Sequence, residues 1–382
     1  MGRKLATKCI HLEEQDKSLH YGSISYPIYQ TATYAHPGVG QSTGYDYSRL
    51  QNPTREQLEK VVASLEGGSD ALAFSSGMAA ITNLMELFQP GDHLIVDADL
   101  YGGSIRLFSH ISEKNGLTFS HVECAKENIE SYIQKNTKAI YIETPTNPMM
   151  NVIDIAKLAQ IAKRHGILLI VDNTFLSPYL QNPLRLGADI VVHSGTKYLA
   201  GHNDTLAGFL VTNREDISEK LRFLIKTTGS GLAAWDSWLV LRGIKTLAIR
   251  MDRAQENAQK LVAWLEQQDA VTRVIYPGRK EHPGYEIMKK QARGFGAMIT
   301  FDVREESYAR VILEQVKLIQ FAESLGGVET LITYPVTQTH ADVPKEVLQS
   351  NGVTEQVLRI SVGIEHASDL IADLEQAFRL VK

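Results

Sequence analysis

The sequence predicts an α/β protein with two domains, and three observations support this prediction. The chain has 382 residues, 43% of them hydrophobic, which is enough apolar material for one large core and a second, smaller one. From residue 55 onwards, short runs of Val, Ile and Leu alternate with helical patterns, as expected for a mostly parallel sheet covered by helices on both faces. Beyond a long helical stretch the strands become fewer, which indicates a smaller α+β unit. We therefore expect an N-terminal arm over 1–54, an α/β domain over 55–245 and an α+β domain over 246–382.

The elements of the α/β domain follow from the local pattern. The first fifty residues are polar, are interrupted by Gly and Pro and show no sustained period, so we expect an extended arm. A helix is predicted over 54–66, and six apolar runs then predict strands: ALAF, HLIV, AIYIE, ILLIVD, DIVVH and GFLVT. In the segment DIAKLAQIAKRHG, Ile155, Leu158 and Ala162 fall on one face of a helix that ends at Gly166.

The C-terminal part has a different pattern. A long helical region is predicted over about 235–267. Three strands are predicted after it, at TRVIYPG, AMITFDV and LRISVG, with helices between and after them. This order indicates a smaller α+β domain.

Composition and charge exclude several classes of function. The formal net charge of -5 and the pI near 6.2 leave no basic surface for nucleic acid or an anionic membrane. Cys9 and Cys124 are too few for a disulfide framework and match no zinc spacing, so we expect a reducing cytoplasm and no metal. No apolar run has the roughly 20 residues that a transmembrane helix needs, and the N-terminus carries no apolar signal, so we expect neither export nor anchoring.

Polar residues follow five of the predicted strands. In open α/β sheets, ligands bind beyond the carboxyl ends of the strands, so these residues are candidate site residues. The segments are SSGMAA, DADLYGG, TPTNP, DNTF and HSGTK. They supply a helix start at Gly77 that suits an anion, an aromatic side chain in Tyr101, an amide in Asn147, a carboxylate in Asp172 and an amine in Lys197.

Most of these residues also have a purely structural interpretation. Ser76 suits a helix N-cap, Tyr101 a core position, Asn147 a turn and Asp172 a loop-capping carboxylate. Lys197 taken alone could be a surface lysine at a strand-to-loop junction, but its context favours a functional role, because a strand end desolvates an amine and so favours its neutral, nucleophilic form. An imine-forming lysine near a carboxylate and a phosphate cradle matches the needs of pyridoxal 5′-phosphate.

In combination, eight motifs resemble the Cys/Met-metabolism family of PLP-dependent enzymes, the group of cystathionine γ-synthase, cystathionine γ-lyase, cystathionine β-lyase and methionine γ-lyase. They occur in family order over essentially the whole chain: YDYSRLQNPTR, FSSGMAA, DLYGG, ETPTNP, VDNTF, HSGTKYLAGHND, AESLGG and LRISVGIE. The resemblance implies the PLP-dependent transferase fold type I, with a mostly parallel seven-stranded sheet in the large domain. It also implies pyridoxal 5′-phosphate as cofactor and an amino acid as substrate.

The resemblance further implies roles for single residues. Lys197 would bind the cofactor and move protons, Asp172 would pair with the pyridine nitrogen, and the Tyr101 ring would stack on the cofactor and assist catalysis. The residues implied to hold the phosphate are Gly77, Met78, Ser194 and Thr196. The residues implied to bind the substrate are Ser324, Arg359 and Asn147, which also adjoins the cofactor. The planar fork of Arg359 suits the substrate α-carboxylate.

The YSR motif implies an oligomer. In the family its tyrosine and arginine reach the phosphate from a neighbouring subunit, which here would be Tyr47 and Arg49. The resemblance thus implies a homotetramer built from dimers with shared active sites. An arm without a core of its own is then expected to fold against a second copy.

The implied reaction is cleavage of a carbon–sulfur bond in cystathionine or a related amino acid, by β- or γ-elimination. Gly102 stands where methionine γ-lyases typically carry a cysteine, which disfavours that member. The motif AESLGG resembles the corresponding segment of γ-synthases and γ-lyases. The segment ITYPVTQTHADVP resembles enzymes of Gram-positive bacteria, in which β-lyases also have the SLGG form, so these motifs do not separate the three activities. Cystathionine γ-synthase, which replaces the acyl group of an O-acylhomoserine with cysteine, is the alternative. A scaffold relative without catalysis is a remote alternative that needs none of Lys197, Asp172 and Arg359.

Overall fold

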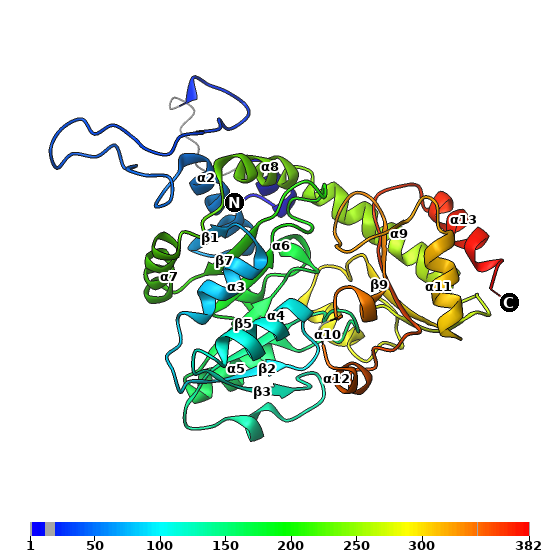
Figure 1. Ribbon diagram of the computed structural model, residues 1–382. Helices are drawn as coiled ribbons and strands as arrows, with labels where there is room; N and C mark the ends of the chain where they lie inside the picture. Colours follow the sequence, from blue (N-terminus) through cyan, green and yellow to red (C-terminus); the bar gives the residue numbers. More distant parts are fainter. Residues whose placement is uncertain (1, 12–19, 342, 382) are drawn as a thin grey trace.

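The computed structural model describes residues 2–11, 20–341 and 343–381, and two β-sheets organise this part of the chain (Figure 1). The larger sheet has seven strands in the order β1-β7-β6-β5-β4-β2-β3. They are β1 (Asp70–Phe74), β2 (His93–Asp97), β3 (Thr118–Val122), β4 (Thr137–Glu143), β5 (Leu168–Asp172), β6 (Ile190–Ser194) and β7 (Gly208–Thr212). The strands from β3 to β6 are parallel, and β7 runs antiparallel to both β6 and β1. The predicted mostly parallel sheet is therefore confirmed.

Helices cover both faces of this sheet. On one face lie α3 (Gly77–Met85), α4 (Gly102–Leu107) and α7 (Glu215–Thr228). The other face is covered by α2 (Pro53–Glu66), α5 (Ile155–His165), α6 (Ser177–Leu180) and α8 (Ala234–Ile244). Because both faces are covered, the central strands β2, β5 and β6 are largely buried and consist mainly of Val, Ile and Leu, with polar residues near their ends. Helix α5 ends at Gly166 in the left-handed conformation, as its sequence predicts.

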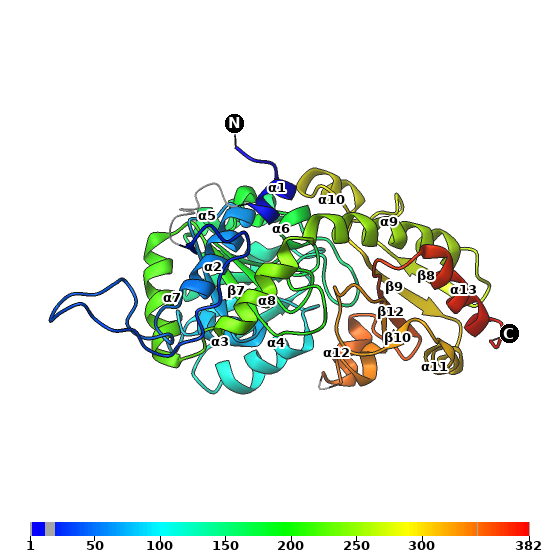
Figure 2. The ribbon, with the colours of Figure 1, turned by 90° about the horizontal axis from the view of Figure 1, so that it is seen from above.

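The smaller sheet has the order β10-β11-β12-β9-β8. Its strands are β8 (Val271–Ile275), β9 (Met298–Val303), β10 (Gln320–Phe321), β11 (Leu331–Thr333) and β12 (Val357–Ser361). The helices of this part are α9 (Leu247–Leu265), α10 (Tyr285–Gln291), α11 (Glu306–Gln315), α12 (Lys345–Ser350) and α13 (Ala367–Phe378). Helices α9, α11 and α13 pack together beside the sheet (Figure 2). The predicted helical region at 235–267 is two helices, α8 and α9.

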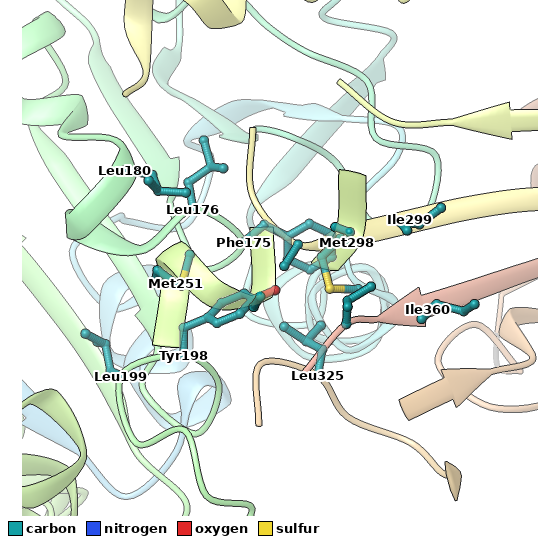
Figure 3. Packing of buried hydrophobic residues seen from close by; sticks show 14 of the residues in the cluster. Phe175, Leu176, Leu180, Tyr198, Leu199, Met251, Met298, Ile299, Leu325 and Ile360 are labelled. Atoms are coloured by element: carbon teal, nitrogen blue, oxygen red, sulfur yellow. The ribbon is translucent and has the colours of Figure 1, made fainter. Parts of the chain in front are cut away.

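One apolar cluster joins the two sheets behind the strand ends. Phe175 follows β5, Tyr198 follows β6, and both pack with Met251 of α9 and Met298 of β9 (Figure 3). Side chains of this cluster are fully or nearly fully buried. The loops that follow β5 and β6 therefore pack against α9 and β9, and this packing fixes the side chains of the two loops.

The N-terminal arm differs from the prediction in one respect. A short helix, α1 (Leu5–Ile10), lies within the segment predicted to be extended, because Cys9 packs against α2 and α9. Residues 20–52 have irregular structure and form a loop that projects from the body (Figure 1). The arm ends at Asn52, whose side-chain oxygen caps α2 by accepting hydrogen bonds from the backbone N–H groups of Thr54 and Arg55. Within the described residues, no helix has the length and apolar character to cross a membrane.

Candidate active site

A pocket opens at the carboxyl ends of the parallel strands, where the larger sheet faces the smaller one. Ten residues predicted from the sequence line it: Gly77, Met78, Tyr101, Asn147, Asp172, Ser194, Thr196, Lys197, Ser324 and Arg359. The pocket at the strand ends thus brings together residues that lie far apart in the chain, from Gly77 to Arg359.

Lys197 lies in the turn after β6. Its amide donates to the Ser194 carbonyl at 3.2 Å, and the turn packs closely because a Cβ at Gly195 would lie 2.4 Å from the Phe209 ring. The Lys197 amine donates to Ser324 Oγ at 3.0 Å. Burial, followed by the charge of Arg359, lowers the pKa of Lys197 to about 8. A much larger fraction of this amine is neutral at pH 7–8 than for a surface lysine.

Ser324 connects Lys197 to Arg359. Its φ of 138° lies in the left-handed region that non-glycine residues rarely adopt, so the backbone is strained there. In this conformation the hydroxyl accepts from Lys197 while the carbonyl accepts from Arg359 Nη2 at 3.0 Å. The strained residue therefore orients two cationic groups of the pocket at once.

Arg359 on β12 is the most buried cation of the pocket, with a side chain 1% exposed. Nη1 donates to Asn147 Oδ1 at 2.7 Å, and Nη2 also donates to Thr333 Oγ1 at 3.2 Å. Its Nε has no hydrogen-bond partner in the described part of the chain, and no ion pair joins Arg359 to a described carboxylate. Burial lowers the pKa of Arg359 to about 10. A buried guanidinium without an anion is a site for a carboxylate ligand.

Asp172 ends β5 beneath this pocket. Its Oδ1 accepts hydrogen bonds from Thr174, from the amide at 3.0 Å and from the hydroxyl at 2.6 Å. Burial raises the pKa of Asp172, and the two bonds from Thr174 lower it. These bonds favour the ionised form, which is the form that pairs with a protonated ring nitrogen.

The start of α3 forms one end of the pocket. Ser76 caps this helix by accepting the Ala79 amide at 3.0 Å, so the structural interpretation of Ser76 is correct. The first helical residue, Gly77, faces Ser194, because a Cβ at Gly77 would lie 3.2 Å from the Ser194 Cβ. Thr196 Oγ1 accepts the Ala207 amide at 3.0 Å in the same region. Helix amides and hydroxyls converge there, as a phosphate requires.

Tyr101 precedes α4 and lies against the backbone of Gly103, where a Cβ would be 2.4 Å from the tyrosine ring. Its amide donates to Glu143 Oε2 at 3.1 Å. Burial raises the pKa of the Tyr101 phenol, which therefore stays protonated at neutral pH.

Tyr47 and Arg49 lie away from this pocket. The Arg49 guanidinium donates to the Lys226 carbonyl at 2.6 Å and sits 5.5 Å from the centre of the Tyr47 ring. Neither residue lines the pocket of its own chain. The structure of one chain therefore does not bring the YSR motif to the other predicted site residues.

Several pocket residues were missed by the sequence interpretation. Glu143 and Thr174 lie in the strand-end motifs ETPTNP and VDNTF, so the strand-end rule would have included them. Glu323, Leu206 and Thr339 line the pocket from irregular segments. None of the three directly follows a predicted strand of the large sheet, so the strand ends do not mark them, although Glu323 belongs to AESLGG and Thr339 to ITYPVTQTHADVP.

The donor set fits pyridoxal 5′-phosphate. Lys197 offers an amine, Asp172 an anion for the ring nitrogen, Tyr101 a flat ring, and the start of α3 a phosphate cradle around Gly77. Within the described residues, no cluster of His, Cys, Asp and Glu has the geometry of a metal site.

Comparison with known proteins agrees with this fit. The family model described as Cys/Met metabolism PLP-dependent enzyme matches residues 6–379. The cystathionine gamma-synthase/O-acetylhomoserine (thiol)-lyase of Bacillus subtilis (strain 168) is 51% identical, over 94% of this chain and 93% of the relative. A cystathionine beta-lyase of Lactococcus lactis subsp. cremoris (strain MG1363) is 46% identical, over 98% of each chain. The crystal structure of cystathionine gamma-lyase from Lactobacillus plantarum complexed with L-serine matches with a TM-score of 0.96 and 43% identity, over 99% of each chain.

The names of these relatives give different reactions within one family. The PLP-dependent fold type I is thereby confirmed for this chain, together with pyridoxal phosphate as its cofactor. The pocket contains the predicted strand-end lysine, and the family model matches nearly the whole length of the chain. The chain therefore belongs to the Cys/Met metabolism PLP-dependent enzymes.

Proposed function

We propose that this enzyme cleaves a carbon–sulfur bond of cystathionine by elimination. The observation that carries the proposal is Arg359, a buried guanidinium that has no ion pair with any described carboxylate and is connected to Lys197 through Ser324. Such a site selects an amino acid, because the α-carboxylate neutralises Arg359 while the α-amino end lies toward Lys197.

The proposed roles separate substrate binding from proton transfer. Arg359, supported by Asn147 and Ser324, binds the α-carboxylate. Lys197 holds the cofactor and moves the proton at the substrate α-carbon, for which its pKa of about 8 is suited. Bound pyridoxal phosphate supplies an electron sink for the negative charge that develops at that carbon. The protonated Tyr101 phenol assists the departure of sulfur.

The remaining residues are proposed to hold the cofactor. Asp172 contacts its ring nitrogen, and the phosphate is held by Gly77, Met78, Ser194 and Thr196. We further propose that Tyr47 and Arg49 reach this phosphate from a second copy of the chain, in a homotetramer of dimers. Their position outside the pocket of their own chain supports this arrangement.

The test is to incubate the holoenzyme with cystathionine alone and identify the products. β-Elimination with water gives homocysteine, pyruvate and ammonia, whereas γ-elimination gives cysteine, 2-oxobutyrate and ammonia. Either keto acid, formed together with its thiol, supports the proposal. Absence of both keto acids from a cofactor-loaded enzyme contradicts it.

Cystathionine γ-synthase is the second candidate, and the 51% identity to the Bacillus subtilis γ-synthase favours it. That reaction forms cystathionine from an O-acylhomoserine and cysteine and releases the carboxylic acid. Production of cystathionine from these substrates, without keto acid from cystathionine itself, would establish the synthase in place of the lyase.

A further inference from the structure

Glu143 is a second buried carboxyl group in the pocket, and the roles proposed above do not use it. It ends β4 directly beside Asp172, because the parallel register of β4 and β5 pairs these two residues. Both side chains line the same pocket, and Glu143 is 4% exposed. Two carboxylates at adjacent positions of a buried site repel each other when both are ionised.

The surroundings of the two carboxyl groups are unequal. Asp172 accepts two hydrogen bonds from Thr174, whereas Glu143 accepts one, from the Tyr101 amide at 3.1 Å. No ion pair joins Glu143 to a lysine, arginine or histidine in the described part of the chain. Because donors stabilise the charged form, these hydrogen bonds favour the negative charge on Asp172 and the proton on Glu143.

Burial and the acidic groups around Glu143 act in the same direction, whereas the charge of Arg359 opposes them. Burial, and next the charge of Asp172, raise the pKa of Glu143 well above its usual range, and Asp99 and Asp97 at the end of β2 add to this effect. The cation on this side is Arg359 of β12, and its hydrogen bonds go to Asn147, Ser324 and Thr333 rather than to Glu143.

We propose that Glu143 is a positioning residue that works as a neutral carboxylic acid, holding the Tyr101 backbone at the start of α4. A neutral Glu143 leaves Arg359 available to the substrate carboxylate and does not repel that carboxylate. Tyr101 is the residue that precedes α4, and its amide donates to Glu143. The Glu143 side chain therefore also sets the position of the Tyr101 ring, which is proposed to stack on the cofactor. The inference rests on the proposed function for its use of Arg359, but its test does not require turnover.

Glu59 of α2 provides a matched control. It is also 4% exposed and its side chain also accepts one backbone N–H, that of Ala73 at 2.9 Å. Unlike Glu143, it pairs with Arg222 at 2.7 Å and with Arg55 at 3.9 Å. Burial raises the pKa of Glu59, and the charges of Arg222 and then Arg55 oppose this effect, which favours the ionised form more than the surroundings of Glu143 do.

The experiment compares Glu143→Gln, Glu143→Ala and Glu59→Gln as apoenzyme and holoenzyme. Glu143→Gln keeps a neutral acceptor for the Tyr101 amide, so we expect its melting temperature to stay within about 1 °C and its cofactor Kd within about twofold. Glu143→Ala removes the acceptor and is expected to weaken cofactor binding about tenfold. Glu59→Gln breaks a buried ion pair and is expected to lower the melting temperature by about 5 °C or more.

Infrared difference spectra between the wild type and each variant detect the proton on the Glu143 carboxyl group directly. They are recorded at pH 8, above the pKa values of about 7 for Asp97 and about 6 for Asp99. A protonated carboxyl band that disappears in Glu143→Gln and persists in Glu59→Gln supports the proposal. A spectrum without that band, or a Glu143→Gln variant that binds cofactor as weakly as Glu143→Ala, overturns it. Neither result depends on which substrate the enzyme cleaves, so failure of the lyase proposal is a separate outcome.

Discussion

The pocket and the N-terminal arm hold their side chains in opposite ways. In the pocket, polar groups are tied to partners from other elements, as Lys197 is to Ser324 and Arg359 is to Asn147. In the arm, Ile24 and Val39 are 92% and 107% exposed, and residues 20–52 form no helix or strand of more than a few residues. Apolar side chains of this size lose about 1.5–3 kcal/mol each when they stay in water instead of being buried.

This difference indicates which parts of the active site a single chain can form by itself. An apolar cluster joins the two sheets behind the strand ends, and the cations of the pocket have their hydrogen-bond partners within one chain. The arm has no such enclosure, and it carries Tyr47 and Arg49. We therefore expect substitutions in the pocket to act within their own subunit, and substitutions in the YSR motif to act on the neighbour.

The largest effect is expected at Lys197. Replacing it with Ala should lower turnover about a thousandfold or more, because the covalent link and the proton carrier are both lost. The melting temperature of the apoenzyme should not fall, since removal of a buried amine relieves a desolvation cost. Borohydride reduction of the wild-type holoenzyme, followed by peptide mapping, should place the cofactor on the peptide that contains Lys197. Label on another lysine would contradict the assignment.

The next largest effect is expected at Arg359. Arg359→Lys keeps the charge but loses the planar fork and its bonds to Asn147 and Ser324, so kcat/KM should fall about 100-fold. Arg273→Lys is the control, because Arg273 lies on the edge strand β8 of the same sheet, away from the pocket, with a half-exposed side chain that pairs with Asp302 at 2.7 Å. Its kcat/KM should be unchanged. Equal losses in the two variants would mean that Arg359 stabilises the sheet rather than the substrate.

A smaller effect is expected when pH is varied and the rate of cofactor uptake is measured. The neutral amine of Lys197 is the form that reacts with the cofactor, and its pKa is about 8. The rate at which apoenzyme takes up pyridoxal phosphate should therefore rise about tenfold from pH 7 to pH 9 and then level off. A rate that continues to rise beyond pH 9, as for an ordinary lysine near pH 10.4, would show that the pocket does not shift this pKa.

Sequence and structure agree best where a residue's role is local. Asp172 follows an apolar run directly and Lys197 lies within five residues of one, so the position of both at strand ends identified them without any relative. Arg359 and Ser324 belong to the smaller sheet and its loop, and only the family resemblance connected them to Lys197. Their approach to the strand ends is a tertiary property that no local pattern encodes.

The missed elements have physical explanations too. Strand β3 (Thr118–Val122) is an edge strand with a polar, partly exposed sequence, and β10 and β11 have two and three residues. Such segments carry too few apolar positions for a periodic signal. Helix α1 forms because Cys9 is buried against α2 and α9, which the polar sequence around it does not reveal.

The most direct test of the contrast between pocket and arm is subunit complementation. Arg49→Ala subunits and Lys197→Ala subunits are mixed under conditions of exchange and assayed with limiting pyridoxal phosphate, where each variant alone is inactive. If the arm completes the neighbouring pocket, a mixed dimer has one intact site, and about a quarter of the wild-type activity should return for random pairing. If native mass spectrometry shows mixed dimers but no activity returns, Arg49 does not serve the neighbouring pocket and the account is wrong.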